Sequence, residues 1–433
     1  MKKVLLWGAL VAMVLPLGLS VAADEFYQQE DIMKITKDAG EEVDEFFRPK
    51  ADILMDAKTG QILYGDNVDA IRDPGSMAKL MSVYVVLQAI KEGKLSYDTE
   101  IKATAADLEI ANNPLVSNSP IVEGHSYKVR DLLKMTLIPS SSAATIMLAN
   151  KISGNDPDAW LDAMNAWAKK IGMSKSQWNN PSGATTATFE GVYSPKRYDN
   201  GAFNETTPRD MATLGYHIVN EFPELLEITK NFRLTILQGT DEEQEIENYN
   251  YSLPGGRHPL KGADGLKTGS SPRADYNYMV TVERNGQRFV QVTMGVGSYD
   301  VEAAEEIRHI IGNALAEKMF ATYEYKRLLK KGEQEIDGKT YVLPADFYAV
   351  AKKGTKPKLV VKNGYLQADN GLKPLNSQVR VGMKVKEKAG AAEGAVSSSK
   401  GADWHLIFAL LPLLILRYVF KQDKKKYGYP KLF

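Results

Sequence analysis

The stretch YNYMVTVERNGQRFVQVTMGVG, residues 276–297, predicts a β-hairpin that decides the fold. Apolar and polar residues alternate on both sides of Asn285-Gly286, and an Asn-Gly pair between two such segments is a strong hairpin signal. A second hairpin is predicted near the start of the chain, where ADILMDA and QILYGD flank a turn at residues 58–60. The segment from Val301 to about Met319 is predicted to be a closing helix.

The middle of the chain has the pattern of helices. Residues 76–93 predict an apolar-rich helix, and residues 142–152 and 157–173 predict two apolar-faced helices separated by a short turn. Strands are thus followed by helices and then by strands again. This order predicts an α/β (α+β) domain in which both chain ends feed one antiparallel sheet with helices on it. Short strand-like segments at 325–386 predict a small all-β domain after a main domain at 24–320.

The N-terminus has the layout of a secretory signal peptide. Lys2 and Lys3 precede an apolar run that ends in small residues, which predicts a signal peptide at 1–23 that is cleaved after Ala23. An uncleaved N-terminal anchor is the alternative, although the apolar run is short for a membrane span.

The C-terminus predicts a membrane anchor at 404–420, although the apolar run there is short and contains Pro412. A helix lying in the membrane surface is the alternative, but the apolar residues surround the segment instead of forming one stripe. A flexible linker at 387–403 precedes the anchor, and a basic tail at 421–433 follows it. The expected location is the extracytoplasmic face of the cell membrane.

The composition of the 433 residues is that of a folded protein large enough to bury a core. The 54 basic and 54 acidic side chains balance, so net charge gives no steering toward nucleic acid. The chain has no cysteine, which excludes disulfides, thiol catalysis and thiolate metal sites. We expect neither a metal nor another cofactor.

A serine and a lysine with S-x-x-K spacing provide a candidate nucleophile and base. Ser76 and Lys79 lie three residues apart at the start of a predicted helix, so the amine can reach the serine oxygen. Burial and a nearby second cation would lower the lysine pKa enough for it to act as a base. Ser397 and Lys400 have the same spacing, but they lie in the predicted linker, where no packed site could lower a lysine pKa. The five histidines lie in no hydrolase or zinc-protease motif.

The sequence Lys-Thr-Gly also occurs twice. Residues 58–60 join two strands and are most simply a turn, whereas residues 267–269 are predicted to begin a strand that pairs with the hairpin. A lysine and a threonine on such a strand can hold a substrate carboxylate, and the glycine allows substrate backbone to approach closely. The strand itself can bind an extended peptide.

The order S-x-x-K, then an S-x-N element, then K-T-G resembles the signature of penicillin-binding proteins and serine β-lactamases. DPGSMAKLM, NPSGA and DGLKTGSSPRADYNY resemble the low-molecular-mass D-alanyl-D-alanine carboxypeptidases. The β-domain and C-terminal span are most similar to those of staphylococcal members. The resemblance implies a penicillin-binding protein/β-lactamase-like fold with an all-helical subdomain.

The resemblance also implies the roles of the site residues. Ser76 would be the acylated nucleophile and Lys79 its general base. The strand Lys267, Thr268 and Gly269 would bind the terminal carboxylate of the substrate. The backbone N–H groups of Ser76 and Ser270 would form the oxyanion hole.

The middle element has two candidate positions. SGN at Ser153 has the family's letters, but it lies in a turn between two helices. By resemblance, PSSSAATIMLAN aligns with the family element, so Ser140 takes the role of proton relay and Ser142 stands where the family has asparagine. Serine is shorter and lacks the paired donor and acceptor of the amide, which puts the reaction rate in doubt.

These features together predict a serine-type D-Ala-D-Ala carboxypeptidase that trims peptidoglycan stem peptides and is inhibited by β-lactam antibiotics. The expected partners are a pentapeptide ending in D-Ala-D-Ala, β-lactams and the cell membrane, and no nucleic acid. A transpeptidase that uses the same acyl-enzyme is the first alternative. A β-lactamase is disfavoured because the chain has no E-x-x-L-N element, and a wall-binding protein with a weakened site is the non-enzymatic alternative.

Overall fold

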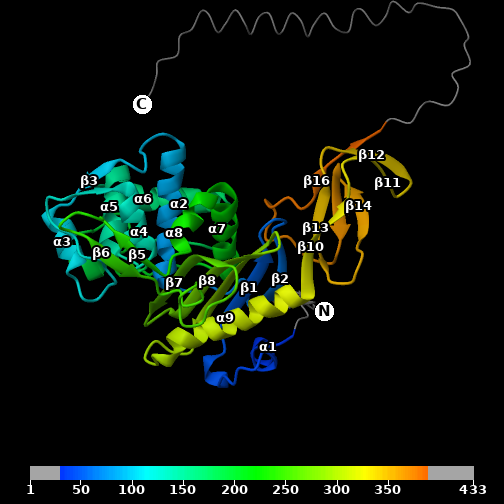
Figure 1. The fold of residues 1–433 in the computed structure, drawn as a ribbon. Helices are drawn as coiled ribbons and strands as arrows, with labels where there is room; N and C mark the ends of the chain where they lie inside the picture. Colours follow the sequence, from blue (N-terminus) through cyan, green and yellow to red (C-terminus); the bar gives the residue numbers. More distant parts are fainter. Residues whose placement is uncertain (1–29, 389–433) are drawn as a thin grey trace, which may run out of the picture. The chain divides into compact units, whose positions relative to one another are not determined.

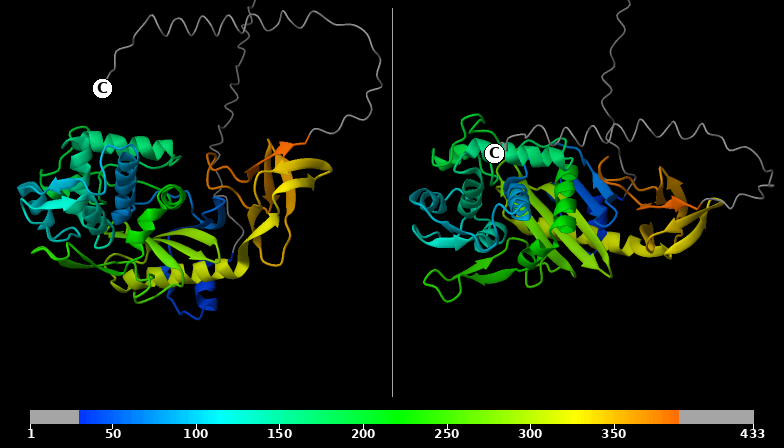
Figure 2. Two further views of the ribbon diagram at one scale, coloured as in Figure 1. Left: turned by 45° about the horizontal axis from the view of Figure 1, so that its top comes forward. Right: turned by 90° about the horizontal axis from the view of Figure 1, so that it is seen from above.

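The computed structural model describes residues 30–388 (Figures 1 and 2). A five-stranded antiparallel sheet in the order β2-β1-β9-β8-β7 draws its strands from both ends of the main domain, as predicted. Its strands are β1 (Ala51–Asp56), β2 (Gln61–Asp66), β7 (Ala263–Ser271), β8 (Asp275–Arg284) and β9 (Gln287–Val296).

The β8–β9 hairpin forms the middle of the sheet as its sequence predicts. Asn285 and Gly286 have φ values of 50° and 78°, the left-handed conformations that a type I′ turn requires, and Gly286 adopts this conformation without strain. Arg284 pairs with Gln287 across the turn. Residues 275–282 are all buried, because helices cover both faces of the sheet.

Helices on the two faces enclose two cores. On one face, α9 (Ala303–Thr322) contacts β8 and β9, and α1 (Ile32–Asp38) packs against α9 (Figure 1). On the other face, α7 (Pro208–Glu221) contacts β1 and β9. Tyr278 and Met279 are neighbours on β8 but belong to different cores, since successive residues of a strand point to opposite faces.

The helical subdomain is built around α5, which is buried over most of its length and contacts α2, α3, α4 and α6. Its helices are α2 (Ala78–Lys91), α3 (Ala105–Ala111), α4 (Val129–Leu137), α5 (Ser142–Ser153), α6 (Pro157–Lys170) and α8 (Leu226–Thr229). Two short two-stranded sheets that the sequence did not predict accompany them. They are β3 (Glu100–Lys102) with β4 (Ser126–Lys128), and β5 (Arg233–Ile236) with β6 (Gln244–Glu247).

The predicted small β-domain follows α9 directly and has its own small core. Its described strands form three sheets with the orders β10-β13, β11-β12-β17 and β14-β15-β16. They are β10 (Tyr323–Leu329), β11 (Gly332–Ile336), β12 (Lys339–Leu343), β13 (Phe347–Lys352), β14 (Lys358–Lys362), β15 (Tyr365–Asp369), β16 (Met383–Lys384) and β17 (Lys386–Glu387). The fold class predicted from the sequence is thereby confirmed.

Residues 370–381 of the β-domain, the docking segment, pack against the main domain. Leu375 is fully buried in the larger core of that domain, its N–H donates to Gly60 O at 2.8 Å, and Arg209 Nη1 donates to Leu375 O at 2.9 Å. Pro374 forms an isolated bridge with Gln61. The Lys-Thr-Gly of residues 58–60 is therefore a turn, as predicted, and this turn receives the docking segment.

Truncation of Leu375 to alanine should lower the free energy of unfolding by about 2–5 kcal/mol, since it leaves a cavity in the main core. Val342→Ala is the matched control, because Val342 is 42% exposed in the same domain. Urea denaturation of both variants measures the difference. Equal stability of the two variants would show that the docking segment is not part of the core in solution.

The predicted signal peptide (1–23), anchor (404–420) and basic tail (421–433) lie outside the described residues. The predicted linker (387–403) also lies outside them except at its start, where Glu387 belongs to β17. Between residues 30 and 388, no helix is both long and apolar enough to cross a membrane.

Candidate active site

Ser76 lies in a short 3₁₀ turn, η2 (Gly75–Met77), immediately before α2. Asp73 Oδ1 accepts a hydrogen bond from Gly75 N at 2.9 Å, which fixes the entry to this turn. The residues on both sides of Ser76 are buried, whereas Ser76 itself is partly exposed. The predicted nucleophile is therefore held at a helix start and remains accessible, where the helix dipole favours developing negative charge.

Lys79 reaches Ser76 as the spacing predicted. Its Nζ lies 3.2 Å from Ser76 Oγ and donates to Ser182 O at 2.8 Å. The side chain is only 1% exposed, and this burial lowers the pKa of Lys79 from 10.5 to about 7. A substantial fraction of the amine is therefore neutral near pH 7 and can accept the proton of the serine.

The second Lys-Thr-Gly lies on β7, at the edge of the sheet and against η2. Lys267 and Thr268 are buried, and burial together with the positive charges of Lys79 and Arg308 holds the pKa of Lys267 well below its usual value. Strand β7 begins at Ala263, four residues before the predicted start at Lys267. The sequence did not indicate these four residues, because Ala-Asp-Gly-Leu shows no alternation of apolar and polar residues. An edge strand leaves one side open for an extended peptide.

Gly269 makes the close approach of β7 and η2 possible. A Cβ at this position would lie 2.8 Å from Met77 N and 2.9 Å from Ser76 N, closer than real contacts allow. Ser270 also lies close to the turn, since a Cβ on Gly75 would lie 3.0 Å from Ser270 N. The two backbone N–H groups predicted for the oxyanion hole, those of Ser76 and Ser270, thus belong to segments in contact.

Gly269→Ala should therefore lower the acylation rate by about 10–100-fold, since the added methyl pushes β7 away from the N–H of Ser76 and weakens one oxyanion donor. The acylation rate with a labelled penicillin is the measurement. Gly255→Ala is no suitable control, because Gly255 has a φ of 89° that alanine rarely adopts. Gly201→Ala is the control, because Gly201 has ordinary backbone geometry and only the side chain of Asp199 near the added methyl. An unchanged rate in Gly269→Ala would contradict the role of this contact.

The three consecutive serines lie at the start of α5 and differ in their environments. Ser140 has a φ of 64°, the left-handed conformation, and its Oγ is buried without a hydrogen bond among the described residues. Ser141 caps the helix by accepting from Ala144 N at 3.2 Å. Ser142 is the first helical residue, and its N–H donates to Ser117 O at 2.9 Å. Among residues 30–388, no hydrogen bond joins Ser140 or Ser142 to Lys79, so their roles stay predictions.

Ser153 ends α5 and lies in the turn that the sequence predicted for it. Its Oγ accepts from Asp156 N at 3.2 Å, and Gly154 and Asn155 both have positive φ values. These are the contacts of a helix terminus.

Several polar residues that support the site were not predicted. Asn277 on β8 donates to Asp73 O and accepts from Gly295 N, both at 2.9 Å, and so ties the turn before Ser76 to the sheet. The NPSGA segment contributes Ser182, whose carbonyl holds Lys79, and Asn180, whose Oδ1 accepts from Gly183 N at 2.7 Å. The resemblance of NPSGA to the family was the one sequence signal that could have identified Ser182 and Asn180 as site residues.

The pair of His309 and Ser252 gives no second catalytic site. His309 pairs with Ser252 at 3.2 Å, but both side chains are completely buried, and burial lowers the pKa of His309 well below its usual value. No group of three His, Cys, Asp or Glu side chains that could hold a metal occurs within residues 30–388.

Comparison with known families agrees with this geometry. Residues 39–298, more than half of the chain, match the peptidase S11 family, described as D-alanyl-D-alanine carboxypeptidase. Residues 325–386 match a domain of unknown function, DUF1958. The particular resemblance to staphylococcal members stays a prediction.

Individual proteins show the same similarity. The D-alanyl-D-alanine carboxypeptidase DacA of Haemophilus influenzae is 27% identical over 67% of this chain and 66% of its own length, so the match spans just under two thirds of that relative. The structure of a peptidoglycan synthesis regulatory factor (PBP3) from Streptococcus pneumoniae shares the fold, with 24% identity, a TM-score of 0.66, and coverage of 78% of this chain and 97% of that one. Penicillin-binding protein D2 of Listeria monocytogenes, in its ampicillin-bound form, is 27% identical, with a TM-score of 0.52 and coverage of 64% and 100%.

Proposed function

The chain belongs to the peptidase S11 family of D-alanyl-D-alanine carboxypeptidases, and from this premise we propose that it is a serine-type D-Ala-D-Ala carboxypeptidase. The observation that carries the proposal is the buried Lys79 amine, 3.2 Å from the accessible Ser76 Oγ and beside the β7 strand. Its substrate is a peptidoglycan stem peptide that ends in D-Ala-D-Ala, and β-lactams acylate the same serine.

The first half of the reaction forms an acyl-enzyme. Neutral Lys79 accepts the Ser76 proton while Oγ attacks the carbonyl carbon of the penultimate D-alanine. The N–H groups of Ser76 and Ser270 stabilise the oxyanion, a contribution of about 3 kcal/mol per donor. The C–N bond then breaks, and the terminal D-alanine leaves with a proton that Ser140 relays to its amine.

The second half returns the enzyme to its starting state. Water attacks the ester carbonyl, Lys79 accepts the proton of the water, and the Ser76 oxygen leaves and is reprotonated. Lys267 and Thr268, on the edge strand, hold the terminal carboxylate of the incoming peptide. An amine in place of the water would give transpeptidation from the same intermediate.

Incubation with a D-Ala-D-Ala-ended pentapeptide and with a labelled penicillin tests this function. We expect release of D-alanine, and a labelled tryptic peptide that contains Ser76. A cross-linked peptide dimer instead of free D-alanine would indicate transpeptidation, and rapid turnover of the penicillin would indicate a β-lactamase. Absence of both labelling and D-alanine release would refute the enzymatic function.

We further propose that the enzyme acts at the extracytoplasmic face of the membrane, anchored through residues 404–420. The sequence pattern of both termini supports this location. Fractionation of cells that express the full chain or a chain truncated after Asp403 tests the anchor. We expect only the full chain in the membrane fraction, and equal distribution of the two would contradict the proposal.

A further inference from the structure

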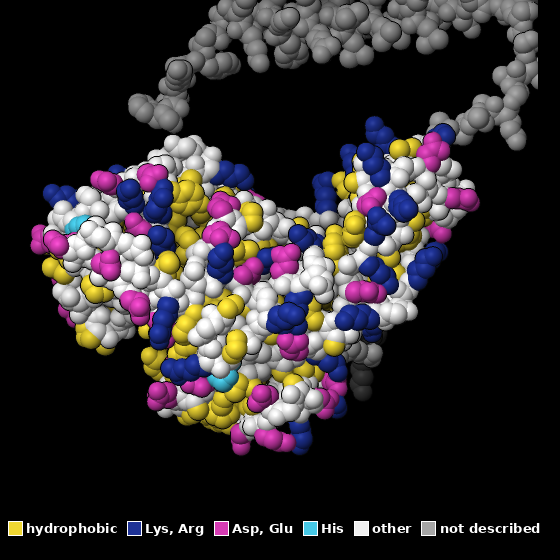
Figure 3. Space-filling view, in the orientation of Figure 1, with side chains coloured by type: hydrophobic (Ala, Val, Ile, Leu, Met, Phe, Trp, Pro, Cys, Tyr) yellow, Lys and Arg dark blue, Asp and Glu magenta, His cyan; other side chains and the backbone are white. Residues whose placement is uncertain are grey.

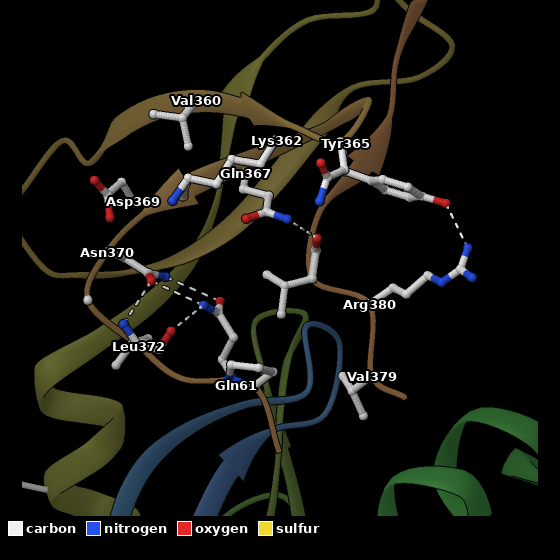
Figure 4. A pocket seen from close by; sticks show the side chains of 15 residues that line it. Gln61, Val360, Lys362, Tyr365, Gln367, Asp369, Asn370, Leu372, Val379 and Arg380 are labelled. Atoms are coloured by element: carbon white, nitrogen blue, oxygen red, sulfur yellow. Dashed lines mark hydrogen bonds between the residues drawn. The ribbon is translucent and has the colours of Figure 1, made fainter. Parts of the chain in front are cut away.

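A pocket outside the candidate active site lies between β14, β15 and the docking segment of the β-domain (Figure 4). Its volume is about 590 Å³, within the range of pockets that hold small ligands. Gln61 from β2 of the main domain also lines it. The pocket is therefore formed where the β-domain meets the main domain.

Amide side chains hold the walls of the pocket in place. Gln61 and Asn370 form a two-way amide pair, with Nε2 to Oδ1 at 3.1 Å and Nδ2 to Oε1 at 3.2 Å. Asn370 Nδ2 also donates to Val350 O at 2.9 Å, and Gln367 Nε2 donates to Val381 O at 3.1 Å. These bonds fix both sides of the pocket before any ligand arrives, which lowers the entropy loss on binding.

Other polar groups of the pocket remain able to bind a ligand. The Gln367 carbonyl oxygen lies in the centre of the pocket in Figure 4, with Tyr365 and Arg380 at one end and Asp369 at the other. Arg380 Nη1 donates to Tyr365 Oη at 2.9 Å, which fixes the ring. Among the described residues, neither Lys362 nor Arg380 forms an ion pair.

The chemistry of these groups matches a saccharide. Amide and hydroxyl groups can bond to sugar hydroxyl and acetamido groups, and the tyrosine ring and valine side chains can pack against the apolar face of a sugar. A site for a polyanion is favoured by an excess of cations and no carboxylate, whereas this pocket contains Asp369 and several amides beside its two cations. Mixed charge at the ends and amides in the centre favour an amino-sugar chain.

We propose that this pocket binds the amino-sugar glycan strand of peptidoglycan. The proposal rests on the proposed function in one respect, since the stem peptides that the site at Ser76 would cleave are attached to such strands. Binding of the strand to the pocket would hold its stem peptides near the site at Ser76. The encounter of a stem peptide with this site then becomes intramolecular, at a raised effective concentration. The β-domain would thus favour the polymeric substrate over free peptide.

Titration of the full chain with peptide-free glycan strands, prepared by amidase digestion of peptidoglycan, tests the binding site. Calorimetry should show saturable binding that Tyr365→Ala and Gln367→Ala each weaken by about 5–10-fold, the range of one well-placed contact. Tyr348→Ala is the matched control, because Tyr348 is a 41% exposed tyrosine of the same domain that does not line the pocket. Glycan strands that do not bind, or variants that bind like the wild type, would overturn the proposal.

A polyanion is the competing ligand class, since residues 325–386 contain fourteen Lys and Arg against five Asp and Glu. Polyglutamate is the probe. Binding of polyglutamate that salt abolishes, together with no binding of glycan strands, would overturn the saccharide proposal in favour of a charged surface.

Hydrolysis assays separate this proposal from the proposed function. Tyr365→Ala should raise the KM for D-alanine release from polymeric peptidoglycan about 5–10-fold and leave the release from a soluble pentapeptide unchanged. Failure of the wild type to hydrolyse the pentapeptide would refute the proposed function. The result of the glycan titration would not depend on this outcome. Equal loss on both substrates would show that the pocket acts only through stability.

Discussion

Replacement of Lys79 by methionine should lower the rate of Ser76 acylation by about 10²–10⁴-fold, the usual contribution of a positioned general base. Methionine retains the length and the apolar stem of lysine but has no amine to accept the serine proton. Stopped-flow acylation with a labelled penicillin measures the rate. Ser76→Ala, which has no nucleophile, defines the zero of the assay.

The pH dependence of acylation should follow the titration of Lys79. The pKa of this amine is about 7, and only its neutral form accepts a proton, so the wild-type rate should rise with pH through about 7 and then level off. Lys79→Met should lose this rise. A wild-type rate that is flat between pH 5 and 9 would contradict the assignment of Lys79 as the base.

The same burial makes Lys79 a burden on stability. Because its pKa is lower in the folded chain than in the unfolded one, the unfolded chain binds more protons between about pH 7 and 10.5, and stability contributed by this group rises with pH across that window. Below about pH 7 the penalty for the buried charge is fully present. Lys79→Met should therefore not lower the melting temperature at neutral pH, which separates loss of the base from loss of the fold.

The sequence predicted the sheet and the proximity of Ser76 and Lys79 because both depend on short-range patterns. Asn285-Gly286 between alternating segments specifies a hairpin through local backbone geometry, and Ser76 and Lys79 lie within one helical turn. The two Lys-Thr-Gly sequences could be distinguished by the secondary structure predicted around each of them. The Lys-Thr-Gly of residues 58–60 joins two strands and is a turn, whereas that of residues 267–269 lies on an edge strand beside Ser76.

The features that the sequence did not predict depend on pairings of distant residues. The Asn277 amide bonds to the carbonyl of Asp73, and the Lys79 amine bonds to that of Ser182. Such contacts involve single polar residues, which have no periodicity to indicate their partners. The contact of the docking segment with the main domain was not predicted for the same reason. Leu375 packs into the core of a domain that ends more than 50 positions earlier in the chain.

Removal of the Ser140 hydroxyl should lower D-alanine release by about 10²-fold or more, if this residue relays the proton to the leaving amine. Ser140→Ala removes the hydroxyl but keeps the Cβ, so the cost of about 1 kcal/mol for the φ of 64° stays as in the wild type. Ser140→Gly is the second variant, since glycine also lacks the hydroxyl but adopts this conformation without strain. Both variants should lose turnover, whereas Ser153→Ala should keep it.

The outcomes for Ser140 and Ser142 together decide whether the three serines form the family's middle element. Normal turnover in both Ser140→Ala and Ser140→Gly would contradict the role of the Ser140 hydroxyl as a proton relay. Ser142→Asn should raise turnover several-fold, because the amide supplies a donor and an acceptor where the serine has one short hydroxyl. Ser142 is, however, only 1% exposed at the first position of α5. The asparagine can improve the reaction only if its larger side chain extends into the substrate site, so a loss of stability without a gain in rate would show that the site has adapted to serine.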